Sequence, residues 1–191
     1  VAYVNSIQRY WTDEFNRRGA RYTPARTALF TDATQTGCGG ATTAVGPFYC
    51  PADKVVYIDL SFMDELRGKL GAQGGAFSEG YILAHEYGHH VQDLQGILAK
   101  LGDQRDTGPQ SMAVRSELQA DCYAGVWAKL SEQAKGWLDR GDVQQAIDSA
   151  ASVGDDRLQK RAQGVAVPDS FTHGSSEQRT RWFRTGLDSG R

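Results

Sequence analysis

The chain has 191 residues, of which 40% are hydrophobic and 23% charged, a composition typical of a folded globular protein. Its 21 basic and 23 acidic side chains leave a formal charge of −2, which argues against a nucleic-acid-binding protein. No run approaches the roughly 18 consecutive apolar residues of a membrane span. The length is that of one domain, and we expect a single domain over residues 1–191.

Hydrophobic spacing and stop signals predict the elements in chain order. Short apolar runs predict strands that form one small sheet, at residues 28–31, 48–50 and 55–60. Amphipathic spacing predicts helices over residues 3–18, 61–70, 78–95, 111–130, 142–163 and 175–185. Residues 102–109 are polar and predict a loop, and Ser175 with Gln178 matches a capping box at the last helix. The predicted fold class is α+β, mostly helical with a small sheet.

Three of the four histidines lie within six residues on the predicted helix 78–95. His85 and His89 are four positions apart, so they lie on one helical face and can share a metal ion. Glu86 lies beside them, where it can hold a metal-bound water, which completes the His-Glu-x-x-His pattern of zinc peptidases. A polar helix face that happens to hold two histidines is the alternative. His90 leaves this face, and we expect it to be a structural histidine.

A third ligand is expected downstream, on the predicted helix 111–130. Glu117 and Asp121 lie four apart, so Glu117 can bind the metal while Asp121 accepts the second N–H of a bound imidazole. An ordinary exposed Glu–Asp pair is the alternative. The same face continues with small side chains that predict close packing against the histidine helix: Ala124, Gly125 and Ala128. Positions 92 and 95 hold glutamine where metzincins carry glycine and a third histidine, which excludes that branch.

The chain resembles known zinc peptidases beyond this motif. The pairing of His-Glu-x-x-His with a downstream Glu-x-x-x-Asp is similar to that of the gluzincins. More closely, the chain resembles the bacterial neutral zinc metallopeptidase family, whose members are described as membrane-anchored. The matching runs cover nearly the whole chain: residues 36–39, 46–53, 56–62, 84–92, 117–127, 154–159 and 168–174. Residues 99–110 depart from the family in being shorter.

The resemblance implies a zincin-like domain that hydrolyses peptide bonds as a zinc-dependent endopeptidase. We expect one Zn²⁺ held by His85, His89 and Glu117, with Glu86 as general base and Asp121 supporting a ligand. The expected partner is a peptide or protein substrate, and the expected location is extracytoplasmic, periplasmic or on the cell surface. A membrane tether would then lie N-terminal to this chain. A zinc-binding regulatory or scaffold protein with little hydrolytic activity is the alternative, against which the intact Glu86 argues, and a purely structural zinc is a third.

The cysteines are interpreted through the same resemblance. In the oxidising location that it implies, we expect a disulfide between Cys38 and Cys50, with two reduced thiols as the alternative. Cys122 lies off the ligand face and is expected to be a buried thiol. The strand at 55–60 is expected either to be purely structural or to be an edge strand that pairs with an extended substrate.

His173 lies away from the motif, in the loop before the last predicted helix. Zinc peptidases need a donor for the oxyanion of the transition state, and we expect His173 to supply it. Gly174 would let the backbone turn there, and the nearby helix N-terminus would favour a neutral ring. A histidine that only braces the loop is the alternative, and Tyr57 and Tyr81 are rival donors.

Overall fold

The computed structural model describes residues 1–62, 76–101, 106–136, 138 and 140–190. Its helices are α1 (Ala2–Arg17), α3 (Ala76–Leu94), α4 (Ile97–Leu101), α5 (Met112–Lys135), α6 (Arg140–Ser152), α7 (Asp155–Gln163) and α8 (Ser176–Ser189). Its strands are β1 (Arg26–Phe30), β2 (Ala33–Thr36), β3 (Gly39–Thr42), β4 (Phe48–Cys50) and β5 (Val55–Asp59). Two 3-10 turns, η1 (Thr43–Val45) and η2 (Pro168–Ser170), complete the described elements. The architecture is α+β and mostly helical, which confirms the predicted fold class.

The three predicted strands form one mixed sheet of order β1-β5-β4. β5 pairs in parallel with β1 and antiparallel with β4, and all five of its residues are buried. The idea that this strand is a free edge is therefore wrong, because both of its edges carry hydrogen bonds to neighbours. β2 and β3 form a separate hairpin, which the sequence did not predict because its residues lack a clear apolar alternation.

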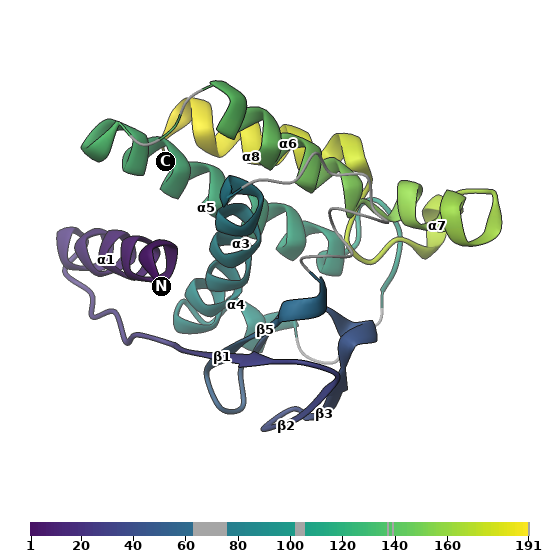
Figure 1. Cartoon of the computed structure of the whole chain (residues 1–191), viewed down its shortest axis with the longest axis horizontal. Coiled ribbons are helices and arrows are strands. Elements are labelled where there is room, and N and C mark those ends of the chain that lie inside the picture. Colours follow the sequence, from purple (N-terminus) through teal and green to yellow (C-terminus); the bar gives the residue numbers. More distant parts are fainter. Residues whose placement is uncertain (63–75, 102–105, 137, 139, 191) are drawn as a thin grey trace.

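Helix α3 occupies the middle of the molecule, with α5, α6 and α8 on one side and the sheet on the other (Figure 1). Its buried face packs into the main core together with side chains from α1, α5 and α8, including Ile7, Trp11, Phe77, Tyr81, Trp127 and Phe183. A Cβ added at Gly88 would lie 3.1 Å from the Cα of Ala120, so α3 and α5 approach closely at this point. That approach brings the predicted ligands of both helices to one place.

The face of α5 that carries small side chains packs partly against a helix other than the one we expected. A Cβ at Gly125 would lie 2.1 Å from the carbonyl oxygen of Phe183, so Gly125 admits α8 rather than the histidine helix. The expectation that Ala124, Gly125 and Ala128 pack against α3 is therefore wrong for Gly125.

Helix boundaries follow local signals, with one clear exception. Ser175 caps α8 in a complete capping box with Gln178, as predicted. The predicted helix 142–163 is instead two helices, α6 and α7, that are separated at Gly154. A Cβ at Gly154 would lie 2.3 Å from the amide nitrogen of Ser176, so this position admits no side chain. The predicted helix 61–70 lies mostly outside the described residues. Within the described part of the chain, no helix has the length and apolar character needed to cross a membrane.

Candidate metal centre

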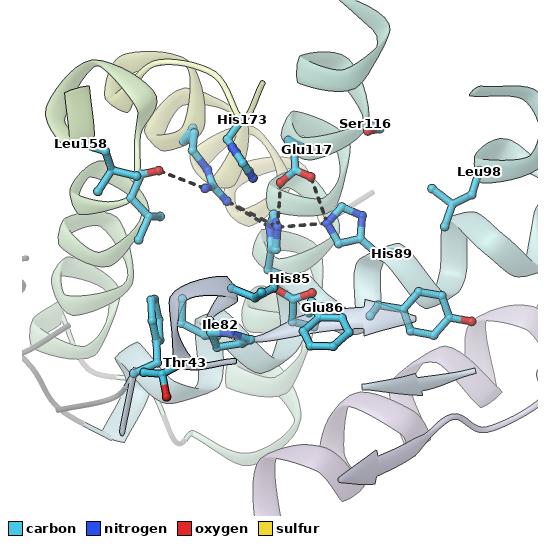
Figure 2. Close-up of a pocket in the computed structure, with 18 residues that line it drawn as sticks. Thr43, Ile82, His85, Glu86, His89, Leu98, Ser116, Glu117, Leu158 and His173 are labelled. Atoms are coloured by element: carbon cyan, nitrogen blue, oxygen red, sulfur yellow. Dashed lines mark hydrogen bonds and ion pairs between the residues drawn. The ribbon is translucent and has the colours of Figure 1, made fainter. Parts of the chain in front are cut away.

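Two neighbouring helices bring three potential ligands to one point (Figure 2). α3 supplies His85 and His89, whose Nε2 atoms are 3.2 Å apart. α5 supplies Glu117, whose carboxylate oxygens lie 3.1 Å from the Nε2 of His85 and 3.4 Å from the Nε2 of His89. All three predicted ligands therefore lie together, with one ligand atom from each within 4.8 Å of the others.

The donor set fits a catalytic zinc site. Two imidazole nitrogens and one carboxylate oxygen are ligands that zinc takes in hydrolases, where a fourth position stays open. With zinc–ligand bonds of about 2.0–2.1 Å, neighbouring ligand atoms of a tetrahedron are about 3.3 Å apart. The two imidazole nitrogens, 3.2 Å apart, match this spacing. Glu117 approaches each of them through a different oxygen, with Oε2 at 3.1 Å from His85 and Oε1 at 3.4 Å from His89.

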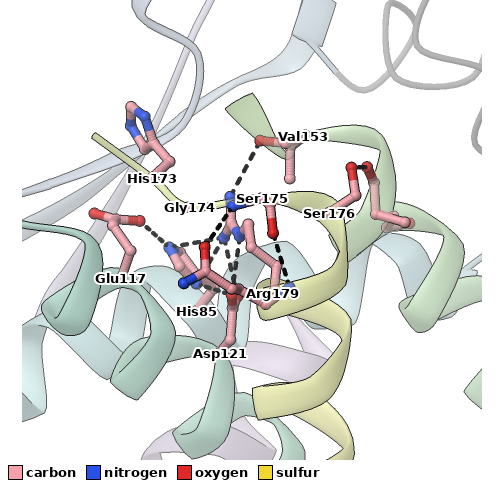
Figure 3. A network of polar contacts seen from close by, with 12 residues as sticks. His85, Glu117, Asp121, Val153, His173, Gly174, Ser175, Ser176 and Arg179 are labelled. Carbon is pink, nitrogen blue, oxygen red and sulfur yellow. Dashed lines mark hydrogen bonds and ion pairs between the residues drawn. The ribbon is translucent and has the colours of Figure 1, made fainter. Parts of the chain in front are cut away.

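His85 is held by a buried charged network (Figure 3). Its Nδ1–H donates to Oδ1 of Asp121 over 2.9 Å, as the sequence predicted, and the hydroxyl of Tyr81 donates to the same oxygen over 2.6 Å. Arg179 of α8 donates to both carboxylate oxygens of Asp121, each over 2.9 Å. Burial alone would lower the pKa of His85, but the Asp121 and Glu117 carboxylates raise it to about 10.

Asp121 is fully buried and yet remains ionised. Burial opposes its charge, but Arg179 and His85 hold the pKa of its carboxyl at about 2. Sequence reasoning missed Arg179, although a signal was present. Arg179 shares the buried face of α8 with Phe183 and Gly186, and a cation on such a face predicts a buried carboxylate partner.

His89 has a neutral partner that sequence reasoning also missed. Its Nδ1 lies 2.9 Å from Oε1 of Gln92, which is one helical turn further along α3. The spacing of three residues was the available signal, because residues i and i+3 are neighbours on a helix. Asp93, which could have supported His89, instead accepts a hydrogen bond from Tyr49 over 2.8 Å.

Glu86 lies beside the three ligands in a cleft of about 660 Å³ that they also line. Burial raises the pKa of its carboxyl, although His85 and His89 oppose this effect. The structure thus places Glu86 where the sequence predicted, next to the ligands and facing a space that can admit a substrate.

His173 lines the same cleft. Asp155, at the start of α7, fixes the loop: one of its carboxylate oxygens accepts the backbone N–H groups of residues 172–174 over 2.7–3.0 Å. Its other oxygen lies 3.4 Å from Nδ1 of His173, and this contact raises the pKa of the imidazole. The expectation that a helix N-terminus favours the neutral ring is therefore wrong in direction. Gly174 has a φ of +91°, as the predicted tight turn requires.

The two rival tyrosine donors are used elsewhere. Tyr57 donates to Asp53 over 2.7 Å, and Tyr81 is fully buried behind His85. His90 is fully buried, donates from Nε2 to the backbone oxygen of Thr23 over 2.7 Å, and is structural as expected.

The disulfide Cys38–Cys50 is present, with an S–S distance of 2.06 Å, which confirms that prediction. It ties the β2–β3 turn to the end of β4, and β4 lines the cleft. A disulfide is typical of an oxidising, extracytoplasmic environment. Cys122 is free and half-buried rather than buried.

The comparisons with known proteins agree with this geometry. The chain is 50% identical over 184 residues to "Uncharacterized protein YpfJ" of Escherichia coli (strain K12), which covers 94% of this chain and 63% of that protein. It is 43% identical over 199 residues to "Uncharacterized protein Rv2575" of Mycobacterium tuberculosis, which covers 100% of this chain and 66% of that protein. The chain thus spans less than two thirds of the length of these relatives. No solved structure gives a significant match.

A family model with the description "Putative neutral zinc metallopeptidase" matches residues 2–191. The match covers the ligand-bearing helices, the disulfide and the His173 loop together. The chain belongs to this family.

Proposed function

We propose that the chain is a zinc-dependent endopeptidase with one catalytic Zn²⁺ held by His85, His89 and Glu117. The observation that carries the proposal is the convergence of these three side chains at zinc spacing in a cleft that Glu86 also lines. A closed structural site would need a fourth protein ligand. Among the described residues, the group whose ligand atoms all lie within 4.8 Å of one another contains His85, His89 and Glu117 and no fourth residue.

Each residue then has a distinct task. Zinc, when bound, polarises the scissile carbonyl and lowers the pKa of the attacking water. Glu86 accepts the proton of that water and passes it to the leaving amine. His173 donates an N–H to the carbonyl oxygen as negative charge develops there, and Asp155 keeps its ring in place.

The cleft favours an extended peptide with uncharged side chains next to the scissile bond. Among the described residues, β4 is an edge strand of the sheet, and it lines the cleft, so its outer edge can pair with a peptide backbone. Away from the ligand cluster, the described lining side chains are uncharged and largely apolar, including Val45, Phe48, Phe62, Ile82, Leu98 and Leu158. The disulfide supports an extracytoplasmic substrate.

The test compares the zinc-loaded protein with Glu86→Gln on a peptide library and on a denatured proteome. We expect cleavage that a chelator abolishes and zinc restores. Glu86→Gln should keep one zinc per chain while kcat falls by about 10²–10⁴, the range for a lost general base. Zinc-loaded protein that cleaves nothing would favour the scaffold alternative. Full activity in Glu86→Gln would assign the base elsewhere.

A further inference from the structure

We infer that Gln92 is a positioning residue for the metal centre, which fixes His89 and joins it to the segment of α5 that carries Glu117. The inference rests on the proposed zinc site. Gln92 is fully buried, although it is a polar side chain on a helix that contributes much of the core. A buried amide is costly unless all of its polar atoms find partners, so its contacts show which task it performs.

The hydrogen bonds of Gln92 fix the orientation of its amide group. Its Nε2 lies 2.7 Å from the backbone oxygen of Ser116 and 2.9 Å from Oε1 of Gln119. The backbone oxygen of Ser116 can only accept, so the NH₂ end of the amide must face α5. The carbonyl end of Gln92 consequently faces His89, and its Oε1 lies 2.9 Å from Nδ1 of that ring.

The orientation of the Gln92 amide determines which nitrogen of the His89 ring carries the proton. Because Oε1 of Gln92 can only accept, Nδ1 of His89 carries the proton and donates it. In a neutral ring, Nε2 then holds the lone pair, and Nε2 is the atom that faces His85 and Glu117. Gln92 thus selects the tautomer that a metal ligand needs.

The same amide connects the second histidine ligand to the carboxylate ligand. Ser116, whose carbonyl accepts from Gln92, directly precedes Glu117 in α5. A shift of Gln92 would therefore move the His89 ring and release the turn that carries Glu117. His85, by contrast, is held by the ionised Asp121 with its Arg179 partner, so the two histidines have partners of different charge.

The experiment measures zinc affinity by chelator competition in Gln92→Met, which keeps the side-chain length and removes both polar ends. Gln95→Met is the matched control, because Gln95 also bonds to α5, through Tyr123 over 2.9 Å, but it contacts no ligand. We expect zinc binding to weaken about 10–100-fold in Gln92→Met and by less than about threefold in the control. The Co²⁺-substituted variant should also show an altered visible spectrum, which a purely structural role would leave unchanged.

Equal zinc affinity in Gln92→Met and Gln95→Met would overturn the inference, even if Gln92→Met unfolds more easily without metal. If Gln92→Met does not fold, Gln92→Asn decides, because it keeps an amide but is one methylene too short to bond His89 and Ser116 at the same time. At least threefold weaker zinc binding would then support the inference, and unchanged binding would overturn it. Neither readout uses hydrolysis. Absence of peptidase activity in the zinc-loaded wild type would contradict the proposed function and leave the role of Gln92 standing.

Discussion

Replacing Arg179 with methionine removes the cation that balances a fully buried carboxylate. Asp121 would lose two charge-assisted hydrogen bonds of 2.9 Å and keep only its contacts with Tyr81 and His85. Breaking a buried ion pair by removing one partner costs about 3–5 kcal/mol, because the remaining charge stays buried. That loss is a large share of the roughly 5–15 kcal/mol by which a domain is stable.

Urea unfolding of the metal-free protein measures this loss, with Arg184→Met as the control because Arg184 is exposed on the same helix. We expect Arg179→Met to lose about 3–5 kcal/mol and the control less than about 0.5 kcal/mol. Zinc binding should weaken as well, by about 10–100-fold, because Asp121 then holds the His85 ring less firmly. A loss below about 1 kcal/mol in Arg179→Met would refute the view that the buried Arg179–Asp121 ion pair stabilises this part of the fold.

Three further outcomes are expected. Glu117→Ala should abolish stoichiometric zinc binding in metal analysis, because two histidines alone make a weak site, and a tightly loaded variant would place the third ligand elsewhere. Intact-mass analysis of oxidatively produced protein should show Cys38 and Cys50 resistant to alkylation until a reductant is added; free thiols would contradict the structure. The pKa of His173, followed by NMR in the metal-free protein, should lie above the usual value of about 6.5 and fall in Asp155→Asn. The stabilising His173–Asp155 contact is then fully present below about pH 6.5 and is lost as pH rises through the raised pKa; an unshifted His173 would refute it.

Local patterns in the sequence were sufficient for most of the helical framework. The spacing of apolar residues located α1, α3 and α5, and the capping box located the start of α8. The break at Gly154 was not predicted, and the close approach of Gly154 to the backbone of Ser176 is a long-range contact that no local pattern reveals. The β2–β3 hairpin was missed for a related reason: its stability comes from pairing and from the Cys38–Cys50 bond rather than from an apolar face.

The residues of the candidate site also fall into those that local spacing predicts and those that only long-range contacts bring in. His85, Glu86, His89, Glu117 and Asp121 could be found because pairs at i and i+4 share a helical face whatever the tertiary fold. The side chains that orient them come from contacts between helices. Arg179 reaches Asp121 from 58 positions away, and no spacing rule connects the two.

The charges of the centre show why its parts depend on one another. Arg179 offsets Asp121, so the two carboxylates of Glu86 and Glu117 remain for a divalent cation to balance. Burial also raises the pKa of the Glu86 carboxyl, and the nearby His85 and His89 oppose that shift. Gln92 supports His89 with a neutral amide and adds no third uncompensated carboxylate to the same buried space. Asp121 and Gln92 thus give the two histidines one ionised and one neutral partner, so only one of the two partners adds a negative charge to this buried space.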